Sequence, residues 1–217
     1  WSEQEGRFGR IYALKVAVNE PQLTPGTPCP VDAIPPLDQQ LYPTGSLLNG
    51  KLVVAWEDRR PKHTIILAST EEAPDSCRFY PPQRISEQPP QRNLPYGAGH
   101  GVARVAMARF SDSGLFAAWA DKRDFRQGYD IWGSSYSEPK GFQKHERVQD
   151  DFGGLSKQHH TTVAGHPDSS VVVAWDDQRG GNTDVMIRWR QDGEWSDDSP
   201  GPGASGPGLQ SNPRTAR

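Results

Sequence analysis

The feature that most constrains the fold is a short motif, Ala-Trp-x-Asp-x-Arg, which ends an apolar run at three places in the chain. Its tryptophans are Trp56, Trp119 and Trp175, and Trp1 has the same position in a fourth, partly preserved copy, so the spacings are 55, 63 and 56 residues. Each copy is followed, after a polar turn, by a second apolar run near residues 10–16, 64–70, 130–136 or 184–190. These short runs rich in β-branched residues favour strands over helices. Four strands in a unit of this length are typical of a propeller blade.

The repeat therefore predicts an all-β chain that folds as one β-propeller domain, residues 1–217, built from four-stranded blades. We expect the units near residues 1–40, 41–95, 96–155 and 156–210, with 211–217 beginning the blade that closes the ring. A four-bladed ring is favoured, and part of a larger six- or seven-bladed propeller is the alternative, because both ends of the sequence fall inside a repeat. The 22 Gly and 20 Pro suit the many turns of such a fold.

The repeated residues are expected to serve the fold rather than one active site. The tryptophans can pack between neighbouring blades, and each Asp and Arg can form charge-assisted hydrogen bonds across a hairpin. The aspartate that opens the next strand is expected to join them, and Thr64 and Arg10 stand in its place in the two remaining units. The structural set is Trp1, Trp56, Asp58, Arg60, Trp119, Asp121, Arg123, Asp130, Trp175, Asp177, Arg179 and Asp184.

An apolar strand ending in Trp-x-Asp-x-Arg, a Gly/Asn turn and a strand opening with Asp-Ile together resemble the bacterial neuraminidase-type repeat proteins, the sialidase-like β-propellers. The resemblance extends through nearly the whole chain. The Asp-box of that family, Ser-x-Asp-x-Gly-x-Thr-Trp, survives only in part at residues 192–195. The resemblance implies the propeller architecture and leaves the activity open, because one propeller fold serves many functions.

Catalytic residues of a sialidase are not evident in the sequence. Such an enzyme needs an arginine cluster, a tyrosine nucleophile with a carboxylate neighbour, and an acid. The Phe/Tyr-Arg-Ile-Pro signature of the family is absent, and the nearest string, residues 9–12, lacks the proline. Arg104, Arg109, Tyr96 and Asp150 are candidates that no sequence pattern brings together. We expect no catalytic and no cofactor-binding residues, so an enzyme is disfavoured.

Metal, nucleic-acid and membrane functions are also disfavoured. His159 and His160 are adjacent, so on a strand they point to opposite faces, and His166 adds no ligand pattern. The carboxylate pairs at 150–151 and 197–198 are interpreted as solvated acidic turns, with calcium ligation as the alternative. A formal charge of -3 gives no nucleic-acid footprint, and no apolar run approaches the length of a membrane span.

Cys29 and Cys77 lie in loop-like surroundings without a Cys-x-x-Cys motif, which favours a disulfide over two free thiols. A disulfide would imply an oxidising compartment, periplasmic or extracellular. A Pro-rich segment, residues 87–101, carries Leu94 and Tyr96 as candidate anchors for a protein partner. These features favour a non-enzymatic, extracytoplasmic propeller that acts as a binding or scaffolding module, an accessory subunit on a larger assembly. The alternative is a carbohydrate-binding or glycoside-hydrolysing sialidase-like protein.

Overall fold

The computed structural model describes residues 1–19, 22–61, 63–86, 101–123, 128–150 and 155–216, and these contain strands, turns and loops but no helix. Accordingly, no helix in the described ranges is long and apolar enough to span a bilayer. The all-β expectation is confirmed for this part of the chain. Leu94 and Tyr96 lie outside the described residues.

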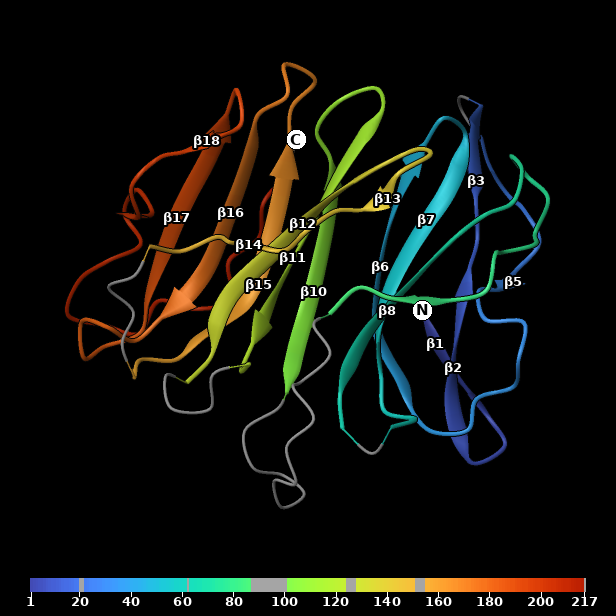
Figure 1. Cartoon of the computed structure of the whole chain (residues 1–217), viewed down its shortest axis with the longest axis horizontal. Helices are drawn as coiled ribbons and strands as arrows, with labels where there is room; N and C mark the ends of the chain where they lie inside the picture. The colour runs from blue at the N-terminus through green and yellow to red at the C-terminus, as the bar shows by residue number, and fades with distance from the viewer. Residues whose placement is uncertain (20–21, 62, 87–100, 124–127, 151–154, 217) are drawn as a thin grey trace.

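Three antiparallel sheets share one design, in which the first three strands of each are hydrogen-bonded neighbours in chain order and short outer strands pair with the third. They lie side by side in Figure 1. The first sheet consists of β6 (Gln40–Leu48), β7 (Lys51–Asp58), β8 (Ile65–Thr70) and β9 (Gln83–Arg84). The second consists of β10 (Val102–Arg109), β11 (Gly114–Asp121), β12 (Asp130–Ser137), β13 (Gly141–Phe142) and β14 (Glu146–Arg147). The third consists of β15 (Gln158–Gly165), β16 (Val171–Asp177), β17 (Asp184–Gln191), β18 (Glu194–Trp195) and β19 (Ser199–Pro200).

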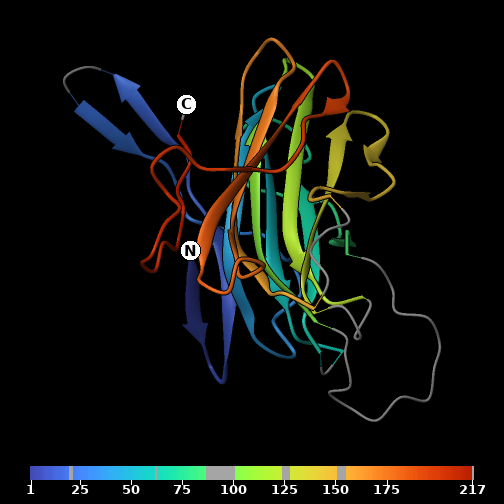
Figure 2. The same cartoon turned by 90° about the vertical axis from the view of Figure 1, so that its left-hand side faces the viewer.

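The amino-terminal part forms two smaller sheets. The larger of these contains β1 (Ser2–Glu5), β2 (Phe8–Ala13) and β5 (Cys29–Pro30), and the other is the hairpin of β3 (Val16–Asn19) and β4 (Gln22–Pro25). In Figure 2 the β3–β4 hairpin projects away from the three large sheets. The described strands form no closed sheet, so the number of blades in a complete ring is not fixed by their pairing.

Each buried repeat tryptophan packs between its own sheet and the preceding one. Trp56, Trp119 and Trp175 are each 0% exposed. Trp119 lies in a cluster with residues of β7 and β8, and Trp175 lies with residues of β11 and β12. Trp56 packs in the same way against Ile11 of β2. Each such indole buries up to about 250 Å², so these clusters join consecutive sheets into one body.

Trp1 differs from the other three, and the expectation that it is buried between blades is wrong. It pairs with Tyr12 through both main-chain hydrogen bonds, as Trp175 pairs with Met186, so its position in the repeat is the expected one. Trp1 is nevertheless 44% exposed, and its indole ring stacks on the Tyr12 ring. The reason is that β1 lies at the edge of its sheet, without an inner strand beside it among the described pairings.

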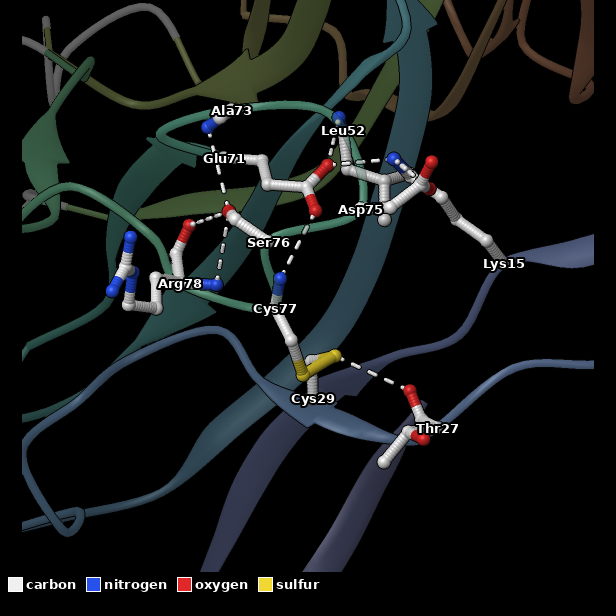
Figure 3. The surroundings of a disulfide bond; sticks show 10 residues. All are labelled: Lys15, Thr27, Cys29, Leu52, Glu71, Ala73, Asp75, Ser76, Cys77 and Arg78. Atoms are coloured by element: carbon white, nitrogen blue, oxygen red, sulfur yellow. Dashed lines mark hydrogen bonds and ion pairs between the residues drawn. A yellow bond between two sulfur atoms is a disulfide. The ribbon is translucent and has the colours of Figure 1, made fainter.

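A disulfide joins Cys29 of β5 to Cys77, which follows the first large sheet's third strand (Figure 3). Beside it, the Lys15 ammonium lies 2.8 Å from the nearly buried Glu71 carboxylate. The Glu71 carboxylate also accepts hydrogen bonds from the main-chain N–H groups of Leu52 and Cys77. These links fix the base of the β3–β4 hairpin to the first large sheet.

Candidate functional site

The repeated Trp, Asp and Arg side chains form one local hydrogen-bond unit in each large sheet. In the third sheet the Trp175 Nε1–H donates to the Asp177 carboxylate over 2.9 Å, and the Arg179 guanidinium donates to the same group over 2.7 Å. The corresponding Trp–Asp distances are 3.3 Å in the first sheet and 3.0 Å in the second. The carboxylates of Asp58, Asp121 and Asp177 are buried, so these bonds hold the turn that follows the second strand.

The next aspartate does not take part as the sequence suggested. Asp130 accepts hydrogen bonds from Arg147, over 3.2 Å, and from Gln149, and Asp184 accepts one from the Gly206 N–H over 3.3 Å. The arginine of each motif instead folds back onto the aspartate two residues before it, because the guanidinium fork matches that carboxylate directly.

The assignment of Thr64 as the counterpart of Asp130 is off by one residue. The strand register places Ile65, not Thr64, opposite Asp58, as Asp130 lies opposite Asp121. Arg10 lies opposite Glu3, which follows Trp1 by two residues as Asp177 follows Trp175.

The interpretation of the two carboxylate pairs as solvated acidic turns is wrong for Asp198 and Asp150, whereas Asp197 is exposed as expected and Asp151 lies outside the described residues. The Asp198 carboxylate lies 2.7 Å from the Arg179 guanidinium and its side chain is almost completely buried, while Asp150 lies 3.3 Å from the same guanidinium. Burial, the largest influence, raises the pKa of Asp198 above its ordinary value despite that ion pair. Among the described residues, no group of three His, Cys, Asp or Glu side chains could hold a metal ion.

The first strands of the three large sheets share an unusual backbone feature. Each has a β-bulge at the same place, and the residue in the bulge is not glycine yet has a positive φ: 49° at Tyr42, 58° at Arg104 and 49° at His160. Asn212 has a φ of 57° in the segment that follows the third sheet. A positive φ is costly for Tyr and Arg, and a bulge re-aims the side chain it carries.

The three bulge residues and Asn212 line one cavity of about 460 Å³, which we call the bulge pocket. Its walls are residues 42–44, 104–106 and 160–162, with Asn212 and Arg214. The carboxy-terminal segment is held there by the Thr215 hydroxyl, 2.9 Å from that of Thr162. Residues far apart in the sequence, from the first strands of the three large sheets and from the segment that follows the third sheet, therefore meet at one place.

Two carboxylates behind the pocket fix its bulges. Glu57 and Asp176 each follow a repeat tryptophan, and each accepts a hydrogen bond from the main-chain N–H of the next unit's bulge residue, Arg104 over 2.8 Å and Asn212 over 2.7 Å. Burial, the largest influence, raises the pKa of Glu57, and the Arg104 N–H offsets part of that effect. Neither carboxylate is among the residues that line the pocket.

The pocket itself is rich in cations and hydrogen-bond donors. The Arg104 guanidinium lies 4.0 Å from the centre of the Tyr42 ring, and within the described ranges neither it nor Arg214 forms an ion pair. His160 is held by the Asp176 carboxylate, 2.5 Å from its Nδ1. Thr161 is 7% exposed, and its buried hydroxyl oxygen has no hydrogen-bond partner in the described part of the chain. This arrangement can receive an anionic, hydroxyl-bearing ligand.

Arg104 and Arg109, the two arginines named above as candidate catalytic residues, lie far apart in the structure. Arg104 lines the bulge pocket, whereas Arg109 lies roughly 17 Å further along β10 at 3.3 Å per residue. Arg109 forms an ion pair with Asp112 over 2.5 Å. His166 is likewise elsewhere, 3.0 Å from Asp168. Asp150 pairs with Arg179, and Tyr96 lies outside the described residues.

Sequence analysis did not single out Tyr42, Asn212 and Arg214, which line the pocket, or Glu57 and Asp176, which hold main-chain N–H groups beside it, and it considered His160 only as a metal ligand. A signal was present, because Gln40, Gln158 and Gln210 each stand two residues before a bulge residue. The bulge residues of the three large sheets also stand 14 or 15 positions before their repeat tryptophans.

Repeated antiparallel sheets whose first strands converge on one cavity define a propeller-type all-β fold, and known structures share it. The sialidase of Trypanosoma rangeli in complex with sialic acid superposes with a TM-score of 0.51 and 12% identity, over 90% of this chain and 34% of the sialidase chain. The same sialidase with the inhibitor DANA gives a TM-score of 0.51 and 10% identity, over 78% of this chain and 31% of the other. At these identities the likeness shows the fold alone.

The α-L-arabinofuranosidase Arb93A of Fusarium graminearum gives a lower TM-score of 0.47, at 15% identity over 74% of this chain and 48% of the enzyme chain. The chain thus spans about half the length of the arabinofuranosidase and about a third of the sialidase. No protein-family model and no curated protein matches the sequence.

Proposed function

We propose that this protein binds a saccharide that carries an anionic group, in the bulge pocket. The observation that supports this most is the pair of arginines, Arg104 and Arg214, which line one cavity and form no ion pair in the described residues; the Arg104 charge acts on the Glu57 carboxylate only from a longer distance. A guanidinium offers a planar fork of donors to a carboxylate or phosphate. Tyr42, Asn212 and the unpartnered Thr161 hydroxyl add the neutral groups that hydroxyl-bearing ligands need.

The fold likeness adds to this proposal. The sialidase that shares the fold was solved with sialic acid, a sugar with a carboxylate, and the same ligand class suits the charge of the bulge pocket. The cavity, about 460 Å³, is within the range of small-ligand sites. These points favour carbohydrate recognition over the scaffolding role, whose candidate anchors Leu94 and Tyr96 lie outside the described residues and which stays a prediction.

The test is a titration with sialic acid by isothermal calorimetry, using the variant Arg104→Ala and the matched control Arg109→Ala. Both variants remove an arginine from β10, and only the first touches the pocket. We expect a loss of at least about tenfold in affinity for Arg104→Ala, since charge-assisted hydrogen bonds contribute about 1.5–3 kcal/mol each. Arg109→Ala should bind as the wild type does. Equal losses in both variants, or no binding by the wild type, would overturn the proposal.

Binding without hydrolysis is the form of the function we propose. Glycoside hydrolysis needs two carboxyl groups that reach the scissile bond. Glu57 and Asp176 are carboxylates that contact pocket-lining residues, and both accept hydrogen bonds from the main-chain N–H groups of those residues instead of lining the pocket. A fluorogenic sialoside should therefore be bound but not cleaved. Cleavage that is abolished by Asp176→Asn would instead establish a glycosidase.

We further propose that the segment 210–215 is the first strand of a fourth blade, completed by β1, β2 and β5. The support is Asn212, which repeats the positive φ and pocket position of the three other bulge residues. The double variant Thr162→Cys/Thr215→Cys tests the placement, because the two hydroxyl oxygens are 2.9 Å apart. Mass spectrometry should find a new disulfide there and none in Thr162→Cys/Ser211→Cys. Absence of the first crosslink would contradict this blade.

The Cys29–Cys77 disulfide supports a further proposal, that the protein works in an oxidising compartment, periplasmic or extracellular. Fractionation of source cells followed by thiol labelling tests it. The protein should be found outside the cytoplasm with both cysteines protected from alkylation. Recovery in the cytoplasm with both cysteines labelled would refute it.

A further inference from the structure

A second cavity lies between the outer strands of the first and second large sheets. Its volume is about 570 Å³, and it shares no lining residue with the bulge pocket. Its walls come from the ends of β8 and β12 and from the segments that carry β9 and β13. We call it the aromatic groove, after Tyr80, Tyr136 and Phe142. Its location on outer strands separates it from the first strands that line the bulge pocket.

The floor and one wall of the groove are aromatic. The rings of Tyr136 and Phe142 lie 5.0 Å apart, and the Tyr136 hydroxyl is 3.1 Å from the hydroxyl of Thr70. Tyr80 is 51% exposed and lines the groove, and its side chain offers a ligand an aromatic ring together with a phenolic hydroxyl. The main chain of Tyr80 is held by Thr70 and Ser69, so the ring is attached to a fixed support.

The rim of the groove carries one positive and one negative side chain, so its net charge is zero. The Lys51 ammonium lies 2.9 Å from the Glu138 carboxylate, and the Asn49 amide donates to the other oxygen of that carboxylate. The hydrogen bond from Lys51 holds the pKa of Glu138 below its ordinary value, and the same bond raises the pKa of Lys51. Both groups therefore stay ionised at neutral pH, and both remain partly exposed.

This combination selects among ligand classes. An anion would meet Glu138 and a cation would meet Lys51, so a charged ligand gains little from a rim whose charges already neutralise each other. A proline-rich peptide offers carbonyl acceptors but no N–H at its prolines, and so gives Glu138 no donor. A sugar hydroxyl both donates and accepts, which suits Glu138 and Lys51 together. The apolar face of a sugar ring suits the open face of Tyr80.

We propose that the aromatic groove is a second saccharide site, specific for neutral sugars and independent of the bulge pocket. The site goes beyond the proposed function, because its ligand class and its residues are different. A volume of about 570 Å³ lies within the range of small-ligand pockets, so the groove can take a short oligosaccharide unit.

The test uses four neutral disaccharides as probes: lactose, maltose, cellobiose and arabinobiose. Saturation-transfer NMR screens them against the full chain, and calorimetry follows those that bind. The variants are Tyr80→Ala and Glu138→Gln, with Tyr42→Ala as the matched control. Tyr42 is a tyrosine of similar exposure, 46% against 51%, that lines the bulge pocket instead.

We expect at least one probe to bind with a dissociation constant on the order of 1 mM. Tyr80→Ala should weaken it at least about tenfold, and Glu138→Gln several-fold, because these changes remove a stacking face and an ionised acceptor. Tyr42→Ala should leave it unchanged. Binding of sialic acid should instead be weakened by the change at Arg104 and not by the change at Tyr80. The two sets of variants therefore distinguish a failure of this proposal from a failure of the proposed function.

Three results would overturn the proposal. The first is that none of the four probes binds at about 10 mM, ten times the expected constant. The second is binding that Tyr80→Ala and Glu138→Gln leave unchanged. The third is binding of a decaproline peptide in the groove, sensitive to Tyr80→Ala, without binding of any sugar. Circular dichroism of each variant confirms that it is folded, and the exposure of Tyr80 makes loss of the fold an unexpected result.

Discussion

Removing the Asp177 carboxylate should destabilise the fold far more than removing Asp184, although both were expected to hold the same hairpin. Asp177 is 1% exposed and receives the Trp175 Nε1–H and three N–H groups of Arg179. These bonds outweigh the effect of burial, which acts in the opposite direction, and lower the pKa of Asp177. Asp177→Ala therefore leaves a buried indole N–H unsatisfied and a guanidinium with fewer partners.

The loss of stability in each variant depends on which hydrogen-bond and ion-pair partners the remaining side chains keep. Breaking a buried ion pair costs about 3–5 kcal/mol, and Arg179 keeps Asp198, so we expect the lower end, about 3 kcal/mol. Asp184 is half-buried and receives the Gly206 N–H over 3.3 Å, so Asp184→Ala should cost about 1 kcal/mol or less. At about 2 cal/mol/K per residue, these losses lower the melting temperature by about 7 °C and about 2 °C.

Urea unfolding followed by tryptophan fluorescence, and thermal unfolding followed by circular dichroism, measure both variants. The slope of the urea transition should be unchanged, so that the midpoint alone reports stability. Equal losses of stability for the two variants would refute the argument that the local Trp–Asp–Arg unit, rather than the aspartate of the next strand, holds the turn.

Three further predictions concern single features of the fold. Glu57→Gln should stabilise the protein at neutral pH, because the raised pKa of Glu57 means that its charged form is disfavoured in the folded state. This gain in stability should shrink as the pH falls towards about 4.3, the pKa of Glu in the unfolded chain. Urea unfolding at several pH values measures it. Cys29→Ser/Cys77→Ser should cost about 4 kcal/mol, since the bond closes a separation of 48 residues, and loss of less than about 1 kcal/mol in calorimetric melting would contradict this. Gly165→Ala should cost about 1–3 kcal/mol in the same assay, because a Cβ would lie 2.2 Å from the Arg109 carbonyl oxygen.

The blade pattern was accessible from the sequence because it depends on local chemistry. An apolar strand, a buried tryptophan and a turn held by Asp and Arg lie within a few residues of one another, so their recurrence shows directly in the sequence. The single error of register, Thr64 for Ile65, arose in a turn. The length of that turn varies, because Ile65 follows Asp58 by seven residues, as Asp184 follows Asp177, whereas Asp130 follows Asp121 by nine.

The exposure of Trp1 and the partners of Asp198 were not accessible in the same way. Both depend on which strand or loop lies beside the residue in space. Trp1 is at a sheet edge, and Asp198 meets Arg179 from a loop 19 positions away. A carboxylate pair in a turn has the composition of a solvated loop, and only the packed arginine makes it an internal ion pair.

The bulge pocket was missed for a different reason, and that reason yields a final prediction. Its residues share a backbone conformation and no side-chain type, and Gly would adopt a positive φ at lower cost than Arg. At Arg104, with φ 58°, glycine should therefore be tolerated better than alanine, by about 1 kcal/mol, although glycine normally weakens a strand. Ala103→Gly, one position earlier, should show the normal loss. Urea unfolding of Arg104→Gly and Arg104→Ala gives the comparison, and both should fail to bind sialic acid. If alanine proves the more stable at Arg104, the backbone is not strained there, and the bulge is not what directs that guanidinium into the pocket.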